Sequence, residues 1–183
     1  MHMFRLKTAL LLVALGTAAT ANAAVNLHAE AGEKFTNLSA SFGANDPGLT
    51  FNGNWGHSDD DGDVAGLGMG FNLPLGPVLF TVGGKALYLN PKDGDEGYAV
   101  AVGGGAQVPL GDFVTVFGDY YYSPDSLSSG VEDYKEANAG VRLHVIKSMN
   151  IEAGYRYIDM EGKNGHRDNT LADGAYAGFN FTF

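Results

Sequence analysis

The last nine residues of the chain, AYAGFNFTF, constrain its fold more than any other segment. Apolar side chains occupy every second position, and the sequence stops on Phe183. A period of two places Phe179, Phe181 and Phe183 on one face of a β-strand. A soluble protein would need a core to cover three Phe side chains on a terminal strand, whereas an outer-membrane barrel exposes such residues to lipid. A closing strand that ends in Phe is typical of outer-membrane proteins, so the segment predicts the last strand of a membrane barrel.

The first 23 residues have the pattern of a secretory signal peptide. Arg5 and Lys7 provide a basic start, an apolar run follows over residues 9–19, and small residues at Ala21 and Ala23 suit a signal peptidase. The apolar run is too short for a helix that crosses ~30 Å of hydrocarbon. We therefore expect cleavage after Ala23 and export, with residues 24–183 forming one domain.

Composition and charge exclude several classes of function. The chain has 11 basic and 21 acidic residues, and two of the basic ones, Arg5 and Lys7, lie in the predicted signal peptide. The remaining net charge of −12 argues against a nucleic-acid partner. Cysteine is absent, which excludes a disulfide framework, a thiolate metal site and a Cys nucleophile. The sequence contains no cofactor motif, and we expect no cofactor.

From Val25 onward, alternation of apolar and polar residues continues through almost the whole chain. Short connections at 44–48, 73–77, 108–112 and 146–150 take turns with longer acidic ones at 57–63, 90–96, 123–136 and 159–169. Tight turns on one side and long loops on the other are typical of an up-and-down membrane barrel. The fold prediction is therefore an all-β, transmembrane antiparallel β-barrel. Ten strands are preferred, and eight remain possible if the first hairpin over residues 25–43 does not pair in this way.

A soluble sandwich or lipocalin-like barrel would also alternate, but with its apolar face inside. Two features favour the membrane barrel. The polar face is mostly small and uncharged, unlike a solvated surface rich in Lys and Glu. Aromatic residues also gather near strand ends, as in the girdles of membrane barrels. The predicted girdle contains Trp55, Tyr88, Tyr98, Tyr120, Tyr122, Tyr155 and Tyr157.

Four long segments resemble the YfaZ family of Gram-negative envelope proteins. They are GNWGHSDDDGDVAGLGMGFNLPLGP, YLNPKDGDEGYAVAVGGG, YYYSPDSLSSG and GYRYIDMEGKNGHRDNTLADGAYAG, and the similarity extends over residues 24–183. The resemblance implies a signal-bearing, porin-like β-barrel in the outer membrane. It carries over no catalytic or ligand-binding residue.

The alternation places a set of charged residues on the inner face of the predicted barrel. Unpaired charges inside a barrel would be costly, so these residues either form a paired polar plug or line a charged constriction that selects small solutes. A barrel of about eight strands is filled by its side chains, and ten strands lie near that limit. The predicted inner charges are Glu30, Lys85, Asp119, Glu136, Arg142, Glu152 and Arg156.

The sharpest polar cluster outside the lumen is the loop with Asp59, Asp60, Asp61 and Asp63. Carboxylates at this density could bind divalent cations, alone or together with lipopolysaccharide phosphates, although the spacing does not match an EF-hand. His57 and His166 lie beside carboxylates in separate loops, and some outer-membrane enzymes use such pairs. No Ser, His and Asp spacing supports this chemistry here, and we expect the protein not to be an enzyme.

Two functional classes remain open from the sequence. The first is a small porin-like barrel that passes ions or small solutes through a narrow charged lumen. The second is a non-conducting barrel that presents acidic loops to lipopolysaccharide, divalent cations or another surface. Both place the protein among the lipids of the cell outer membrane, and neither fixes its oligomeric state.

Overall fold

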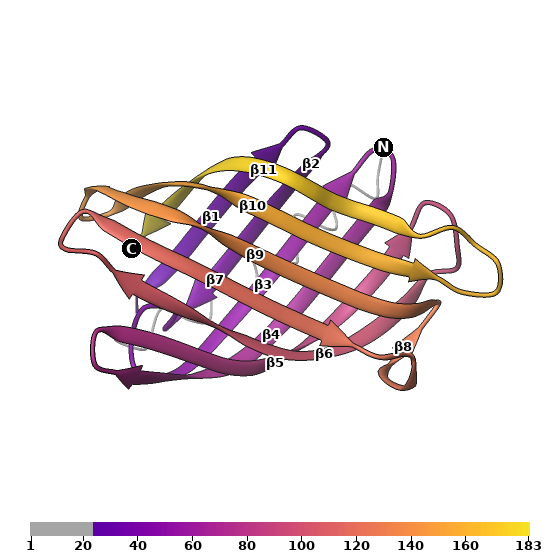
Figure 1. Cartoon of the computed structure of the whole chain (residues 1–183), viewed down its shortest axis with the longest axis horizontal. Coiled ribbons are helices and arrows are strands. Elements are labelled where there is room, and N and C mark those ends of the chain that lie inside the picture. The colour runs from indigo at the N-terminus through magenta and orange to yellow at the C-terminus, as the bar shows by residue number, and fades with distance from the viewer. Residues whose placement is uncertain (1–23) are drawn as a thin grey trace.

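Antiparallel strands cover almost all of residues 24–183, the part of the chain that the computed structural model describes (Figure 1). The predicted signal peptide lies outside these residues. No helix in this part of the chain is long and apolar enough to span a membrane. The strands are β1 (Val25–Gly32), β2 (Phe35–Phe42), β3 (Gly48–Ser58), β4 (Gly62–Leu75), β5 (Val78–Pro91), β6 (Gly97–Pro109), β7 (Val114–Ser123), β8 (Ser128–Ser129), β9 (Val131–Ile146), β10 (Met149–Gly162) and β11 (Asn169–Thr182), with a 3₁₀ turn, η2, at Asp125–Leu127.

Ten of these strands form the wall of a closed barrel. Each pairs with its neighbours in the order β5-β4-β3-β2-β1-β11-β10-β9-β7-β6, and the pairing of β5 with β6 closes the ring. The short strand β8 only adds to one edge of β6. Both β1 and β2 pair along their full length, so the prediction of ten strands is confirmed and the eight-strand alternative is not needed. Closure leaves no strand edge unpaired, which the hydrocarbon of a bilayer requires.

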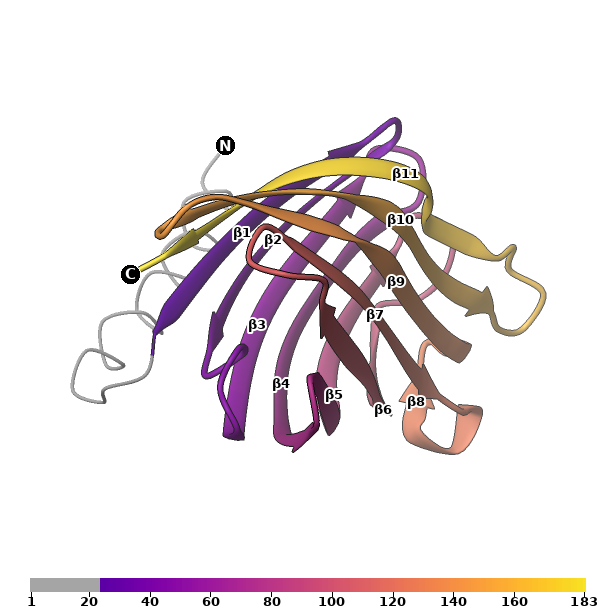
Figure 2. The ribbon, with the colours of Figure 1, turned by 60° about the vertical axis from the view of Figure 1, so that its left-hand side comes forward.

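The two ends of the barrel differ. The start of β1, the C-terminus and the connections 43–47, 76–77, 110–113 and 147–148 lie at one end, here called the turn end (Figure 2). The connections 33–34, 59–61, 92–96, 124–130 and 163–168 lie at the other, here called the loop end. The loops are shorter than expected, because residues such as His57, Asp63 and Asn90 keep pairing across strands. Alternation thus continues into stretches whose acidic composition predicted irregular loops.

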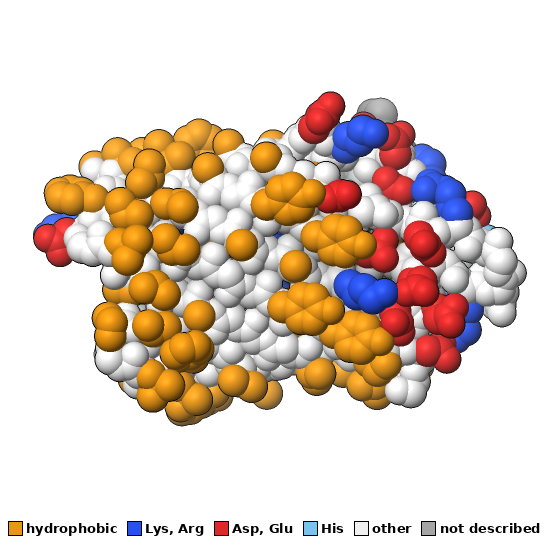
Figure 3. Space-filling view, in the orientation of Figure 1, with side chains coloured by type: hydrophobic (Ala, Val, Ile, Leu, Met, Phe, Trp, Pro, Cys, Tyr) orange, Lys and Arg blue, Asp and Glu red, His pale blue; other side chains and the backbone are white. Residues whose placement is uncertain are grey.

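The outer wall carries the apolar half of the alternating pattern. In β11, Phe179 and Phe181 are 53% and 44% exposed, and Tyr176 and Asn180 on the opposite face are buried. Leu67, Met69 and Phe71 repeat this pattern in β4. Figure 3 shows, on one face, hydrophobic side chains spread along the wall and most of the charged side chains gathered toward the loop end. The outer surface is thus apolar where lipid would cover it and charged beyond.

Candidate functional site

A charged cluster inside the barrel is centred on Arg156 of β10. Its guanidinium forms ion pairs with Glu30 of β1 and with Glu136 of β9, the latter at 3.1 Å between Nη1 and Oε1. Lys85 of β5 also reaches Glu136, with 2.9 Å between Nζ and Oε2. Tyr134 donates its hydroxyl to the same carboxylate at 3.1 Å. All of these residues are buried, so the cluster joins four strands across the lumen.

A second charged group lies nearer the turn end. Arg142 of β9 pairs with Glu152 of β10 and donates from Nη1 to Gln107 of β6 at 3.0 Å. His28 of β1 lies on the other side of Glu152, with 3.2 Å between Nε2 and Oε2. Asp119 of β7 faces Asn138 of β9 in the register but has no ion pair within residues 24–183. The seven charges predicted for the inner face therefore lie there, and six of them are paired with one another.

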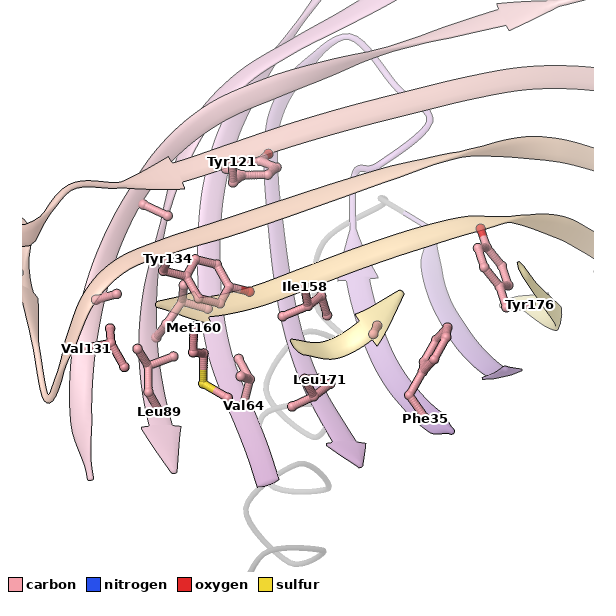
Figure 4. Close-up of a cluster of buried hydrophobic side chains, with 14 residues drawn as sticks. Phe35, Val64, Leu89, Tyr121, Val131, Tyr134, Ile158, Met160, Leu171 and Tyr176 are labelled. Atoms are coloured by element: carbon pink, nitrogen blue, oxygen red, sulfur yellow. The ribbon is translucent and has the colours of Figure 1, made fainter. Parts of the chain in front are cut away.

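The loop-end half of the lumen contains an apolar plug that sequence reasoning missed (Figure 4). Side chains from β4, β5, β9, β10 and β11 meet there and fill the interior. The plug consists of Val64, Leu89, Val131, Tyr134, Ile158, Met160 and Leu171, each 0–1% exposed. The prediction of a lumen lined by small polar residues is therefore wrong for this half. The signal was present in the alternation, because Ile158 and Met160 continue the inward series of Glu152 and Arg156.

The turn end is also covered, by the connection 43–47. The carbonyl oxygens of Gly43 and Asp46 accept hydrogen bonds from the amide of Asn72 at 2.8 and 2.9 Å. Ala44 accepts a hydrogen bond from Gln107 at 3.1 Å, although β6 is three strands away from β3 in the ring. This connection thus extends inward over the lumen. The polar connection 43–47 therefore covers the lumen at the turn end, and the apolar plug fills it at the loop end.

At the loop end, Arg167 links three loops. Its Nη1 is 2.9 Å from Oδ1 of Asp61, its Nη2 donates to the carbonyl oxygen of Asp60 at 3.0 Å, and its Nε is 3.8 Å from Asp93. Asn169 adds two hydrogen bonds to the backbone of Asp93. The strand β11 lies opposite β5 in the ring, so these contacts cross the mouth of the barrel. We call these contacts the loop clamp.

Replacing Arg167 with Ala should loosen the loop clamp without unfolding the barrel. Exposed ion pairs contribute only about 0–1 kcal/mol, so the free energy of unfolding should change little. Hydrogen exchange over residues 59–61 and 92–96 should become faster, since their tether is lost. Lys147→Ala removes the same charge at the turn end and should leave that exchange unchanged. Equal exchange in both variants would contradict the clamp.

The clamp also contains an exposed pair between His166 and Asp93, with 3.0 Å between Nδ1 and Oδ1. The hydrogen bond with His166 lowers the pKa of the Asp93 carboxyl below its ordinary value. A lowered pKa means that the contact is present above the ordinary Asp range and is lost as pH falls through the folded-state value. His166→Ala should therefore raise the pKa of Asp93, as measured by carboxyl NMR titration in micelles. An unchanged midpoint would contradict the assignment.

The acidic cluster of the β3–β4 connection is largely paired with histidine and arginine side chains. Asp59 and Asp63 both contact His57, and Asp61 contacts Arg167. Within residues 24–183 the structure brings no three His, Asp or Glu side chains together in a geometry that could hold a metal ion. Divalent-cation binding by Asp59, Asp60, Asp61 and Asp63 therefore remains a prediction from composition, without support from geometry. His57 and His166 lie apart and each have separate carboxylate partners, Asp63 and Asp93.

Six of the seven aromatic residues of the predicted girdle lie in the loop-side halves of their strands, and Tyr155 lies at the middle of β10. Tyr88 and Tyr98 face each other across β5 and β6, and both are about half exposed. Three tyrosines donate hydroxyl hydrogen bonds to carboxylates: Tyr88 to Glu96, Tyr122 to Asp133 and Tyr155 to Asp173. A ring with an apolar body and a polar tip suits the membrane–water interface. The residues form one belt between the apolar wall and the charged loop end; the structure places Trp55, Tyr120 and Tyr157 in this belt as well.

Comparisons with known proteins identify the family of the chain. The model of the family described as YfaZ precursor matches residues 1–183. The "Outer membrane protein YfaZ" of Escherichia coli (strain K12) is 56% identical over 160 residues, which cover 87% of this chain and 89% of that protein. Among solved structures, the NanC porin has a TM-score of 0.48 at 11% identity, covering 88% of this chain and all of that one. The Neisserial surface protein A has a TM-score of 0.37 at 16% identity, covering 88% of this chain and 94% of that one. The family match and the 56% identical relative carry the conclusion: the chain belongs to the YfaZ family, and it is a β-barrel protein of the outer membrane.

Proposed function

We propose that the protein is a non-conducting outer-membrane barrel that presents a fixed polar surface at its loop end. The observation that carries the proposal is the apolar plug. Residues such as Leu89, Tyr134 and Met160 have no exposed surface, although their side chains project into the lumen. Ions and small solutes need a hydrated path, and a packed apolar layer opposes it.

The charged clusters also favour this proposal over the porin-like alternative. A selective constriction needs charges that face water and meet the passing ion. Here Glu30, Glu136 and Arg156 are 2–6% exposed and bind one another. Such pairing compensates buried charge and ties strands together, which is a structural role.

The loop clamp supports the second half of the proposal. Arg167 and Asn169 hold loops from opposite sides of the ring together, so the loop end has a defined shape. In membrane barrels of this class, the longer loops face the cell exterior. The polar surface would therefore face the outside, where lipid headgroups or other molecules meet it.

A vesicle efflux assay tests the proposal. The refolded protein is inserted into vesicles loaded with K⁺ or with a radiolabelled monosaccharide. Release should match that of protein-free vesicles at every protein-to-lipid ratio. Release that rises in proportion to the folded protein would overturn the non-conducting role and favour the porin-like alternative.

A further inference from the structure

A hollow of about 320 Å³ lies beside the β3–β4 hairpin at the loop end. Its lining includes His57 and Ser58 of β3, Asp63 of β4, Asn90 of β5, and Asp59 and Lys92 of the neighbouring loops. None of these side chains belongs to the two charged clusters inside the barrel. The hollow is therefore separate from the lumen groups described above.

The register shows that three lining residues face outward. His57 is paired with Asp63, and Asp63 is paired with Asn90, so the three form one row across β3, β4 and β5. Their chain neighbours Val64 and Leu89 point inward and are fully buried. Ser58, Gly62 and Pro91 form the adjacent inward row and also line the hollow. The hollow thus lies at the loop-end rim of the barrel, and His57, Asp63 and Asn90 form its outward side.

The height of this row relative to the membrane follows from the aromatic belt. Trp55, Ala65 and Tyr88 form the next outward row toward the turn end. Trp and Tyr side chains concentrate at the level of lipid headgroups. The hollow therefore lies at the outer margin of the headgroup layer, within reach of the polar parts of neighbouring lipids.

The hollow offers hydrogen-bond donors and acceptors side by side. The His57 ring lies between two carboxylates, with 3.0 Å from Nδ1 to Asp63 and 3.2 Å from Nε2 to Asp59, and it stacks on Trp55 at 5.6 Å between ring centres. Asn90 and Lys92 add an amide and an ammonium group. Ser58 also lines the hollow, and its buried hydroxyl has no hydrogen-bond partner within residues 24–183.

This mixture of groups favours a sugar over other ligands. Sugar hydroxyls both donate and accept hydrogen bonds, and carboxylates, amides and hydroxyls supply partners of both kinds. A phosphate would meet the repulsion of Asp59 and Asp63. A metal ion lacks a set of three ligating side chains here. In a concave site, convergent polar groups fix the orientation of a small ligand.

We infer that this hollow binds a sugar unit, supplied by the headgroups of glycolipids in the outer leaflet. The inference deepens the proposed function and rests on it, because it assigns a ligand to the polar surface at the loop end. Asp63 and Asn90 hold hydroxyl groups of the sugar, and Lys92 closes one side of the hollow.

Native mass spectrometry of the full refolded protein tests the inference. The probe is purified rough lipopolysaccharide, which carries lipid A and inner-core sugars. The variant Asp63→Asn/Asn90→Ala should bind at least about tenfold more weakly, because it loses a charge-assisted contact and an amide contact. His57→Gln should weaken binding in the same direction. Asp133→Asn removes an outward carboxylate from β9, outside the hollow, and should bind like the wild type.

Free core oligosaccharide separates the two sources of sugar. If the free oligosaccharide competes with lipopolysaccharide, the site recognises the sugar without its lipid. If it does not compete, but the variants bind lipopolysaccharide more weakly, the site recognises the sugar as part of a membrane-bound headgroup. Equal binding by wild type, His57→Gln and the double variant, or no binding by the wild type, would overturn the inference. Heat-modifiable gel mobility verifies folding of each variant. The efflux assay is independent, so a conducting barrel would overturn the proposed function without deciding whether the sugar binds.

Discussion

Replacing Arg156 with Met should lower the free energy of unfolding by about 3–5 kcal/mol, because the carboxylates of Glu30 and Glu136 would remain buried with one partner fewer. Glu30 would lose its arginine partner, and Glu136 would keep Lys85 and the Tyr134 hydroxyl. Urea unfolding of the barrel in vesicles measures the change. The fluorescence of Trp55, the single tryptophan of the chain, reports it.

A second variant separates loss of an ion pair from loss of packing. Glu30→Gln combined with Arg156→Met removes one charge of each sign and leaves the Lys85–Glu136 pair intact. The double variant should recover about 0.5–3 kcal/mol relative to Arg156→Met alone, since residues in one network couple by this amount. If the double variant is as unstable as the sum of the two single variants, the charged cluster does not act as described.

Adding a methyl group at Gly103 or Gly104 should destabilise the barrel by about 1–3 kcal/mol or prevent folding. A Cβ atom at Gly103 would lie 2.0 Å from the carbonyl oxygen of Tyr120, and one at Gly104 would lie 2.1 Å from that of Thr81. These oxygens belong to the backbone of the adjacent strands β7 and β5, so relief requires the strands to move apart.

Gly174 provides a matched control for these substitutions. It also lies in a barrel strand, β11, but a Cβ atom there would meet no heavy atom within 4 Å. Gly174→Ala should therefore leave stability unchanged or raise it slightly, because alanine restricts the unfolded chain. The urea midpoints of the three alanine variants give the comparison. A loss at Gly174 equal to that at Gly103 would mean that strand crowding is not the cause.

The wall of the barrel was predictable from the sequence because a period of two assigns each residue to one face. Phe179 and Phe181 point outward, and Glu136 and Arg156 point inward, as the alternation indicates. The loops are less predictable, since the acidic composition at residues 57–63 indicates an irregular connection. Cross-strand pairs between His57 and Asp63 keep that segment regular.

The partners inside the lumen were not predictable in the same way. Alternation states which residues face inward, but it does not state which of them lie at the same height. Arg156 meets Glu30, 126 residues away, only because β11 pairs with β1 on one side and with β10 on the other. The apolar plug was missed because each strand contributes only one or two of its side chains, such as Val64, Leu89 and Met160. Their combined effect appears only when five strands bring them together.

Single-channel conductance in a planar bilayer tests the closed lumen most directly. The wild type is compared with a variant in which Leu89, Met160 and Leu171 of the plug are replaced by Ala, with folding of both verified by heat-modifiable mobility. The wild type should give no current steps. The variant should give steps, because water enters the lumen past the shortened plug side chains and around the connection 43–47. Reproducible steps from the folded wild type, with ion selectivity that changes in Arg142→Gln, would contradict a closed lumen and establish a narrow pore.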